Sequence, residues 1–123
     1  MKLRPKSEKT SMSDYYPDRW VIIKITCDKF SPVYKVFACW YGGYTGSDYW
    51  KLNSGITKVV PEGLRYNFEG SSGSIYSCHK DSYGTHMYGM SVLSGMIDKA
   101  LEHGISIEVL PQETEWVDID YGE

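Results

Sequence analysis

One nine-residue run limits the folds open to this chain more than any other part of the sequence. Residues Arg19–Cys27 read RWVIIKITC, and most of them are β-branched or aromatic. Side chains alternate between the two faces of a strand, and here both alternating sets are largely apolar. One set is Val21, Ile23 and Ile25, and the other includes Trp20 and Ile22. The run therefore predicts a central strand with two apolar faces.

Further strands are predicted on both sides of a long loop. Turn residues occupy 28–32, and residues 33–40 (VYKVFACW) predict a second strand, which the short spacing pairs with the first as an antiparallel hairpin. Shorter alternating runs predict strands at residues 49–52, 56–60, 64–69, 74–78 and 105–110. In the run 64–69 we expect Leu64, Tyr66 and Phe68 to face the core and Arg65, Asn67 and Glu69 to face water.

A single helix is predicted over residues 85–103. Its apolar positions follow the spacing of an amphipathic helix, and they are Val92, Leu93, Met96, Ile97, Ala100 and Leu101. Gly104 is placed to end the helix in a left-handed conformation. Thr85 and Ser91 are both candidates for the N-cap, because a hydroxyl oxygen can accept a hydrogen bond from a free N–H of the first turn.

Together these elements predict an α+β fold. We expect a mostly antiparallel sheet of about five to seven strands, covered on one face by a single long helix in the C-terminal half. A chain of 123 residues fits one domain. We assign residues 1–18 to a flexible N-terminal arm, 19–111 to a single α+β domain, and 112–123 to an acidic tail or edge strand.

Charge and composition limit where the protein is expected to reside and which kinds of partner it can bind. The net charge is −3, and the residues from Pro111 onward carry acidic but no basic side chains. A nucleic-acid partner is disfavoured, because such proteins cluster Lys and Arg. The sequence shows no apolar run long enough to span a membrane and no apolar signal-peptide core near its start, so we expect a cytoplasmic location and no membrane contact.

No catalytic signature or metal-binding spacing is present. Cys27, Cys39 and Cys78 are odd in number and lie within apolar or alternating runs, so we expect reduced, buried thiols and no metal. Cys78 adjoins His79, but neighbours along a strand point to opposite faces and cannot act as nucleophile and base together. An enzyme with an unrecognised site is the third functional alternative, and no cofactor is expected.

The loop and short strand at residues 41–56 (YGGYTGSDYWKLNSGI) are the main candidate for binding. This stretch has four glycines and four large aromatics, and aromatic rings beside small polar groups suit a partner side chain or a planar ligand. The candidate residues are Tyr41, Tyr44, Asp48, Tyr49, Trp50 and Asn53. The structural alternative is a β-connection whose aromatics cap one end of the core.

A second Gly-rich loop, Gly70-Ser71-Ser72-Gly73, adds Ser71 and Ser72 to the candidates. Backbone N–H groups and hydroxyls in such a loop can form an anion-binding nest, and the simpler alternative is a hairpin loop. A nucleotide-like or sugar-like ligand held between the two Gly-rich loops is our second functional hypothesis, with Tyr44 and Trp50 stacking on it.

The two segments WYGGYTGSDYWKLNSGI and SSGSIYSCHKDSYG also carry a resemblance. Their texture of aromatics and glycines resembles that of small accessory proteins encoded by tailed bacteriophages. The resemblance implies expression in the host cytoplasm and a role in engaging or inhibiting host machinery, and it transfers no catalytic residue.

Our first functional hypothesis is a small non-enzymatic binding protein. It engages a protein partner, a host protein if the chain is phage-encoded, through the aromatic Gly-rich loop and the adjacent sheet edge. A homo-oligomer is also expected, because the alternation of Val117, Ile119 and Tyr121 predicts an edge strand on which a second copy could pair.

Overall fold

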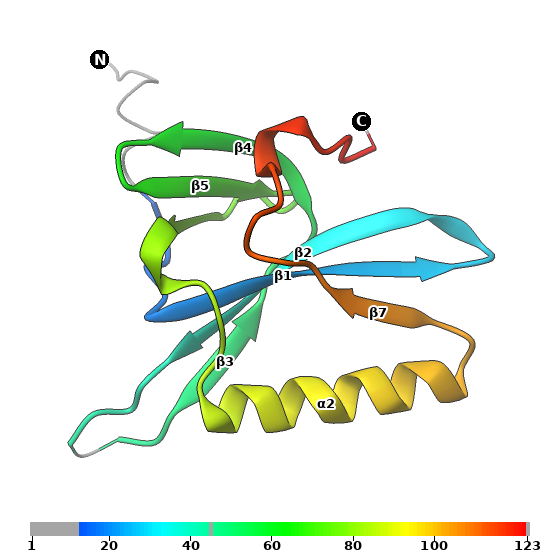
Figure 1. Ribbon diagram of the computed structural model, residues 1–123, viewed down its shortest axis with the longest axis horizontal. Coiled ribbons are helices and arrows are strands. Elements are labelled where there is room, and N and C mark those ends of the chain that lie inside the picture. The colour runs from blue at the N-terminus through cyan, green and yellow to red at the C-terminus, as the bar shows by residue number, and fades with distance from the viewer. Residues whose placement is uncertain (1–12, 45, 123) are drawn as a thin grey trace.

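The protein is a sandwich of three layers, seen in a computed structural model that describes residues 13–44 and 46–122 (Figure 1). A three-stranded sheet and a helix lie on opposite sides of a four-stranded sheet. The elements are β1 (Arg19–Cys27), β2 (Phe30–Trp40), β3 (Tyr49–Leu52), β4 (Ile56–Glu62), β5 (Arg65–Gly70), β6 (Ile75–His79), the 3-10 turn η1 (Lys80–Ser82), α2 (Met87–Glu102), β7 (Ser106–Val109) and the 3-10 turn η2 (Trp116–Asp118).

The α+β fold predicted from the sequence is confirmed. The strand order is β3-β2-β1-β7 in the larger sheet and β4-β5-β6 in the smaller one, and neighbouring strands are antiparallel. The seven strands thus divide between two sheets instead of forming one. Within the described chain, no helix is both long and apolar enough to cross a membrane.

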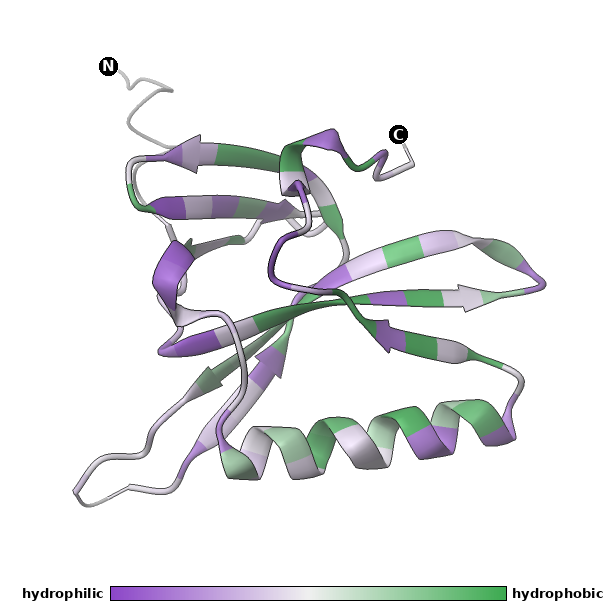
Figure 2. Ribbon diagram, in the orientation of Figure 1, coloured by the Kyte–Doolittle hydropathy of each residue, from purple (hydrophilic) through white to green (hydrophobic). Residues whose placement is uncertain are grey.

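Strand β1 is buried on both faces, as its two apolar sets predict. Val21 and Ile23 face α2 and pack with Phe37 and Cys39. The opposite face, which includes Trp20, packs against the smaller sheet. Figure 2 shows the middle of β1 in green, where it passes between the other layers. A strand between two layers loses water from both faces, so a single apolar face would leave polar groups buried.

Helix α2 has a side-chain cap at its start and a glycine just past its end. Gly104 ends it with φ 74°, as predicted. Neither Thr85 nor Ser91 is the N-cap. His86 occupies that position, and its Nδ1 accepts a hydrogen bond of 2.9 Å from the Gly89 N–H. An imidazole nitrogen with a free lone pair can accept a hydrogen bond from an unpaired N–H of the first helical turn, as a hydroxyl oxygen would.

Strand β5 departs from the predicted orientation at two positions. Leu64 lies in the turn before the strand and is 66% exposed, whereas Asn67 is buried. Asn67 lies in the middle strand of the smaller sheet, and its Nδ2 donates to Glu62 Oε1 at 2.7 Å. Because β5 lies between β4 and β6, water has little access to the Asn67 side chain. Its amide therefore hydrogen-bonds to a neighbouring side chain in place of water.

The acidic segment after Pro111 is docked, but not as a strand. Residues 116–118 form η2, and the Trp116 ring is buried against Trp20, Phe68 and Tyr83. Tyr121 Oη donates to the Trp116 carbonyl at 2.6 Å. The predicted alternation fails because one bulky ring inserts into the core while its neighbour Val117 stays half-exposed.

Part of the predicted N-terminal arm lies along the smaller sheet. The Asp14 and Tyr15 N–H groups donate to the Ile75 carbonyl, and the Ser77 N–H donates to the Tyr15 carbonyl. This short segment therefore covers the edge of β6. Residues 1–12 of the predicted arm lie outside the described part of the chain.

Candidate functional site

Contacts within the loop between β2 and β3 hold its described residues in place. An added Cβ at Gly42 would collide with the backbone of Ser47, so only glycine permits this crossing of the chain. Asp48 Oδ1 then accepts a hydrogen bond of 2.8 Å from the Gly42 N–H. At the base, the rings of Trp40 and Tyr49 stack with their centroids 5.0 Å apart. These contacts hold a loop whose Tyr44 side chain is fully exposed.

The loop and the start of α2 share a set of large exposed side chains. Figure 1 shows the loop projecting past the start of the helix. The His86 ring links the two segments, because its centroid lies 5.2 Å from that of Tyr41 and 6.0 Å from that of Tyr88. We call this set the Tyr/Met surface, and its members are Tyr41, Tyr44, Met87, Tyr88 and Met90, which are 52%, 102%, 89%, 45% and 58% exposed. Tyr88 lies on the His86 side of the helix, whereas Met90 projects from another side, because residues two apart in a helix do not face each other.

Two carboxylates lie beside the loop side of the Tyr/Met surface. Asp18 Oδ2 accepts from the Tyr41 N–H at 2.9 Å, and Asp48 Oδ2 lies 3.8 Å from His86 Nε2. The sequence has no Lys or Arg in residues 36–50 or 81–97, the two segments that form the surface. Arg19, which is outside these segments in sequence, lies against Gly84 just before the helix start. The carboxylates thus flank the loop side of the surface, and one guanidinium flanks the segment that leads into α2.

Trp50 and Tyr49, both predicted to bind, have different environments. The Trp50 ring is partly buried and stacks on the fully buried Phe37, with centroids 5.4 Å apart and an interplanar angle of 20°. Trp50 is thus a core contact beneath α2. Tyr49 is half-exposed, and it points to the other face of β3, because adjacent residues of a strand alternate.

Asn53 was predicted as a polar handle for a ligand, but the structure buries it. Its Oδ1 accepts from the Val36 N–H at 2.9 Å, and its own N–H donates to the Val36 carbonyl at 3.1 Å. This pair of hydrogen bonds extends the β2–β3 ladder by one position after β3 has ended. The role of Asn53 is therefore structural: its side chain satisfies the buried backbone N–H of Val36, which needs a hydrogen-bond partner.

The Ser-rich loop closes the β5–β6 hairpin and contacts the segment before β4. The Ser71 N–H donates to the Gly55 carbonyl at 2.8 Å, and the Ser72 N–H donates to Ser54 Oγ at 2.9 Å. The N–H groups that an anion nest requires are thus bonded within the protein. This loop meets residues 53–55, beyond the end of β3 that lies away from Tyr44, so the structure does not join the two predicted halves of a ligand site.

The fold brings one Cys, one His and one Asp together, although the sequence did not suggest it. Cys39 lies under Gly89, beside the His86 ring, and Asp48 lies on the other side of that ring. Both ring nitrogens have backbone partners, because Nδ1 accepts from Gly89 and Nε2 lies 3.2 Å from the Trp40 carbonyl. Neither nitrogen is free to take the thiol proton, so the arrangement lacks a general base.

Burial sets the chemistry of two thiols. It raises the pKa of Cys39 to about 11 and the pKa of Cys78 well above the ordinary value of 9.0. A thiolate is the reactive form of cysteine, so both side chains are unreactive near neutral pH. Within the described residues, no group of three or more His, Cys, Asp or Glu side chains is arranged to hold a metal ion.

We expect one of the three cysteines to react with Ellman's reagent at pH 8 in the folded protein. Cys27 is partly exposed, contrary to the predicted burial, whereas Cys39 and Cys78 are fully buried. Absorbance should show one thiol in buffer and all of them in guanidinium chloride. A Cys27→Ser variant is the control and should lose the native signal. Fast reaction of a second thiol would contradict the packing described here.

The helix start is the part of the surface that the residue patterns did not identify. Residues 82–97 contain no Asp, Glu, Lys or Arg, which is unusual for a helix with one face in water. That absence is the signal from which Met87, Tyr88 and Met90 could have been found. Comparison with known proteins adds nothing to this assignment: no family model, curated protein or solved structure matches the chain.

Proposed function

We propose that this chain is a non-enzymatic binding protein that engages a protein partner through the Tyr/Met surface. The supporting observation is that five large aromatic or Met side chains, each at least 45% exposed, lie on two segments that the His86 ring connects. Tyrosine buries a large area at low entropic cost, and exposed apolar clusters of this kind mark interaction sites. Methionine side chains can adapt to the shape of a partner.

The charge of the surface indicates the character of the partner. Asp18 and Asp48 border its loop side, and Arg19 Nη2, which lies against Gly84, already donates to the Tyr83 carbonyl. A complementary partner carries Arg or Lys beside an apolar patch, because the cation can pair with a carboxylate and stack on a tyrosine ring. The resemblance to phage accessory proteins makes a bacterial host protein our proposed partner.

The test is a Tyr44→Ala, Met87→Ala double variant. Both side chains are almost wholly exposed, so we expect an unchanged melting temperature and binding weakened at least about tenfold, as for hot-spot residues. Quantitative affinity capture from a bacterial lysate identifies the partner, and titration of that purified partner measures the change.

Leu101→Ala is the matched control, since Leu101 is 61% exposed near the other end of α2. It should retain binding. Trp50→Ala is unsuitable as a test, because loss of the Phe37 stack would itself lower stability. Equal capture by wild type and double variant would refute the proposal. Light scattering on the purified protein shows whether the partner is a second copy of the chain.

A further inference from the structure

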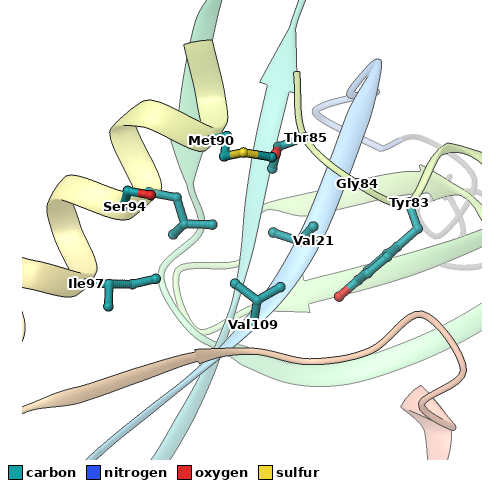
Figure 3. Close-up of a pocket in the computed structure, with 9 residues that line it drawn as sticks. Val21, Tyr83, Gly84, Thr85, Met90, Ser94, Ile97 and Val109 are labelled. Atoms are coloured by element: carbon teal, nitrogen blue, oxygen red, sulfur yellow. The ribbon is translucent and has the colours of Figure 1, made fainter. Parts of the chain in front are cut away.

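A second, separate feature is a cleft of about 360 Å³ between α2 and the β1–β7 edge (Figure 3). Val21 forms its floor, and Figure 3 shows Met90, Ile97, Val109 and Tyr83 around it. The other lining residues are Gly84, Thr85, Leu93 and Ser94. Of these residues only Met90 belongs to the Tyr/Met surface.

The cleft exists because two different segments share one edge of β1. Strand β7 pairs with β1 only over residues 23–26. Beyond them the Gly84 N–H donates to the Trp20 carbonyl at 2.8 Å. Tyr83 Oη bridges the two segments, because it accepts from the Ile22 N–H at 3.1 Å and donates to the Leu110 carbonyl at 2.6 Å.

The Tyr83 wall of the cleft is fixed in advance of any ligand. Arg19 Nη2 donates to the Tyr83 carbonyl at 2.9 Å and lies against Gly84, which has φ 131°. The Tyr83 ring meets the buried Trp20 ring edge-on, with centroids 4.7 Å apart. A preformed wall costs little ordering entropy on binding, which favours a specific site over an adaptable surface.

The chemistry of the lining selects the class of ligand. None of the lining residues is Lys, Arg, His, Asp or Glu. Three carry hydroxyls, and that of Tyr83 is already used twice. The hydroxyls of Thr85 and Ser94 form no hydrogen bond with any residue that the structure describes. In Figure 3, Thr85 and Ser94 lie on the rim on either side of Met90.

We infer that this cleft binds a small, uncharged, largely apolar molecule, one polar atom of which hydrogen-bonds to Thr85 or Ser94. None of the side chains that line the cleft is charged, and Arg19, which lies behind Gly84, already donates to the Tyr83 carbonyl. A charged ligand would therefore lose more water than it regains in contacts, which disfavours nucleotides and carboxylates. The volume lies at the lower end of the range for small-ligand sites. The cleft shares only Met90 with the Tyr/Met surface, and its proposed ligand does not depend on the protein-binding proposal.

A pair of fluorescent probes tests the class of ligand. N-phenyl-1-naphthylamine is uncharged, and 8-anilinonaphthalene-1-sulfonate carries the same rings with an added sulfonate. We expect the neutral probe to give a saturable rise in fluorescence with one molecule bound per chain. The sulfonated probe should bind at least about tenfold more weakly, because no charged side chain lines the cleft and the Arg19 guanidinium behind Gly84 is already bonded to the Tyr83 carbonyl.

Two variants on α2 locate the binding. Ser94→Phe places a ring on the rim and should weaken binding of the neutral probe about tenfold or more. Ser91→Phe is the matched control, since Ser91 is also exposed but lies outside the lining, and it should bind as the wild type does. Circular dichroism melting verifies that both variants are folded.

Three results would overturn the inference: no saturable binding of the neutral probe, equal binding of the sulfonated probe, or wild-type affinity in Ser94→Phe. The Tyr44→Ala, Met87→Ala variant should keep the probe site, because neither residue lines the cleft. Failure of the cleft proposal and failure of the protein-binding proposal are therefore measured independently.

Discussion

Replacing Trp116 with alanine is expected to lower the free energy of unfolding by about 3–5 kcal/mol, the usual cost of removing a buried aromatic side chain. The Trp116 ring is only 2% exposed, and its centroid lies 5.9 Å from that of Trp20 and 5.6 Å from that of Tyr83. Its loss leaves a cavity between the two sheets that the surrounding rings cannot fill. Urea denaturation followed by Trp fluorescence measures the change.

Val117→Ala is the control for this variant. Val117 is the next residue but is 50% exposed, so its truncation should change stability by less than about 0.5 kcal/mol. Equal stability of the two variants would show that η2 is not docked on the core. The expected contrast would make residues 116–121 a structural part of the domain and not a dispensable acidic tail.

Replacing Gly89 with alanine is expected to destabilise the protein by about 2–3 kcal/mol through overpacking. A Cβ at this position would lie 2.5 Å from Cys39 Sγ and 3.0 Å from His86 Nδ1. Both neighbours are held in place, because Cys39 is fully buried in β2 and His86 caps the helix. The start of α2 would have to move away from the sheet, and thermal melting should detect the loss.

Gly95→Ala is the matched control on the same helix. Nothing lies within 4 Å of a Cβ added there. Alanine should therefore stabilise the protein by about 0.5–1 kcal/mol, since glycine in a helix interior costs conformational entropy. A Gly89→Ala, Cys39→Ala double variant should recover part of the lost stability, because it removes the clashing sulfur. Additive losses would mean that the thiol is not the obstacle.

The candidate site was only partly accessible to sequence reasoning. Tyr41 and Tyr44 were selected as aromatics in a Gly-rich loop, and the structure leaves both exposed. Trp50 met the same criterion but is partly buried and packs against the core, because α2 covers its side of β3. An aromatic residue in or beside this Gly-rich loop can thus be exposed or buried, depending on whether α2, which comes much later in the sequence, covers it. His86 illustrates this too, since its role depends on Trp40 and Asp48.

The local elements and the fold class follow from the residue pattern alone. Alternation over residues 19–27 identified β1, and the 3.6-residue period with Gly104 identified α2, because both signals come from neighbours within a few positions. Only the tertiary structure decided that the strands divide into two sheets, that Trp116 enters the core, and that a cleft opens beside Val21. These features depend on contacts between residues such as Trp20 and Trp116, which are remote along the chain, and short-range periodicity carries no information about such contacts.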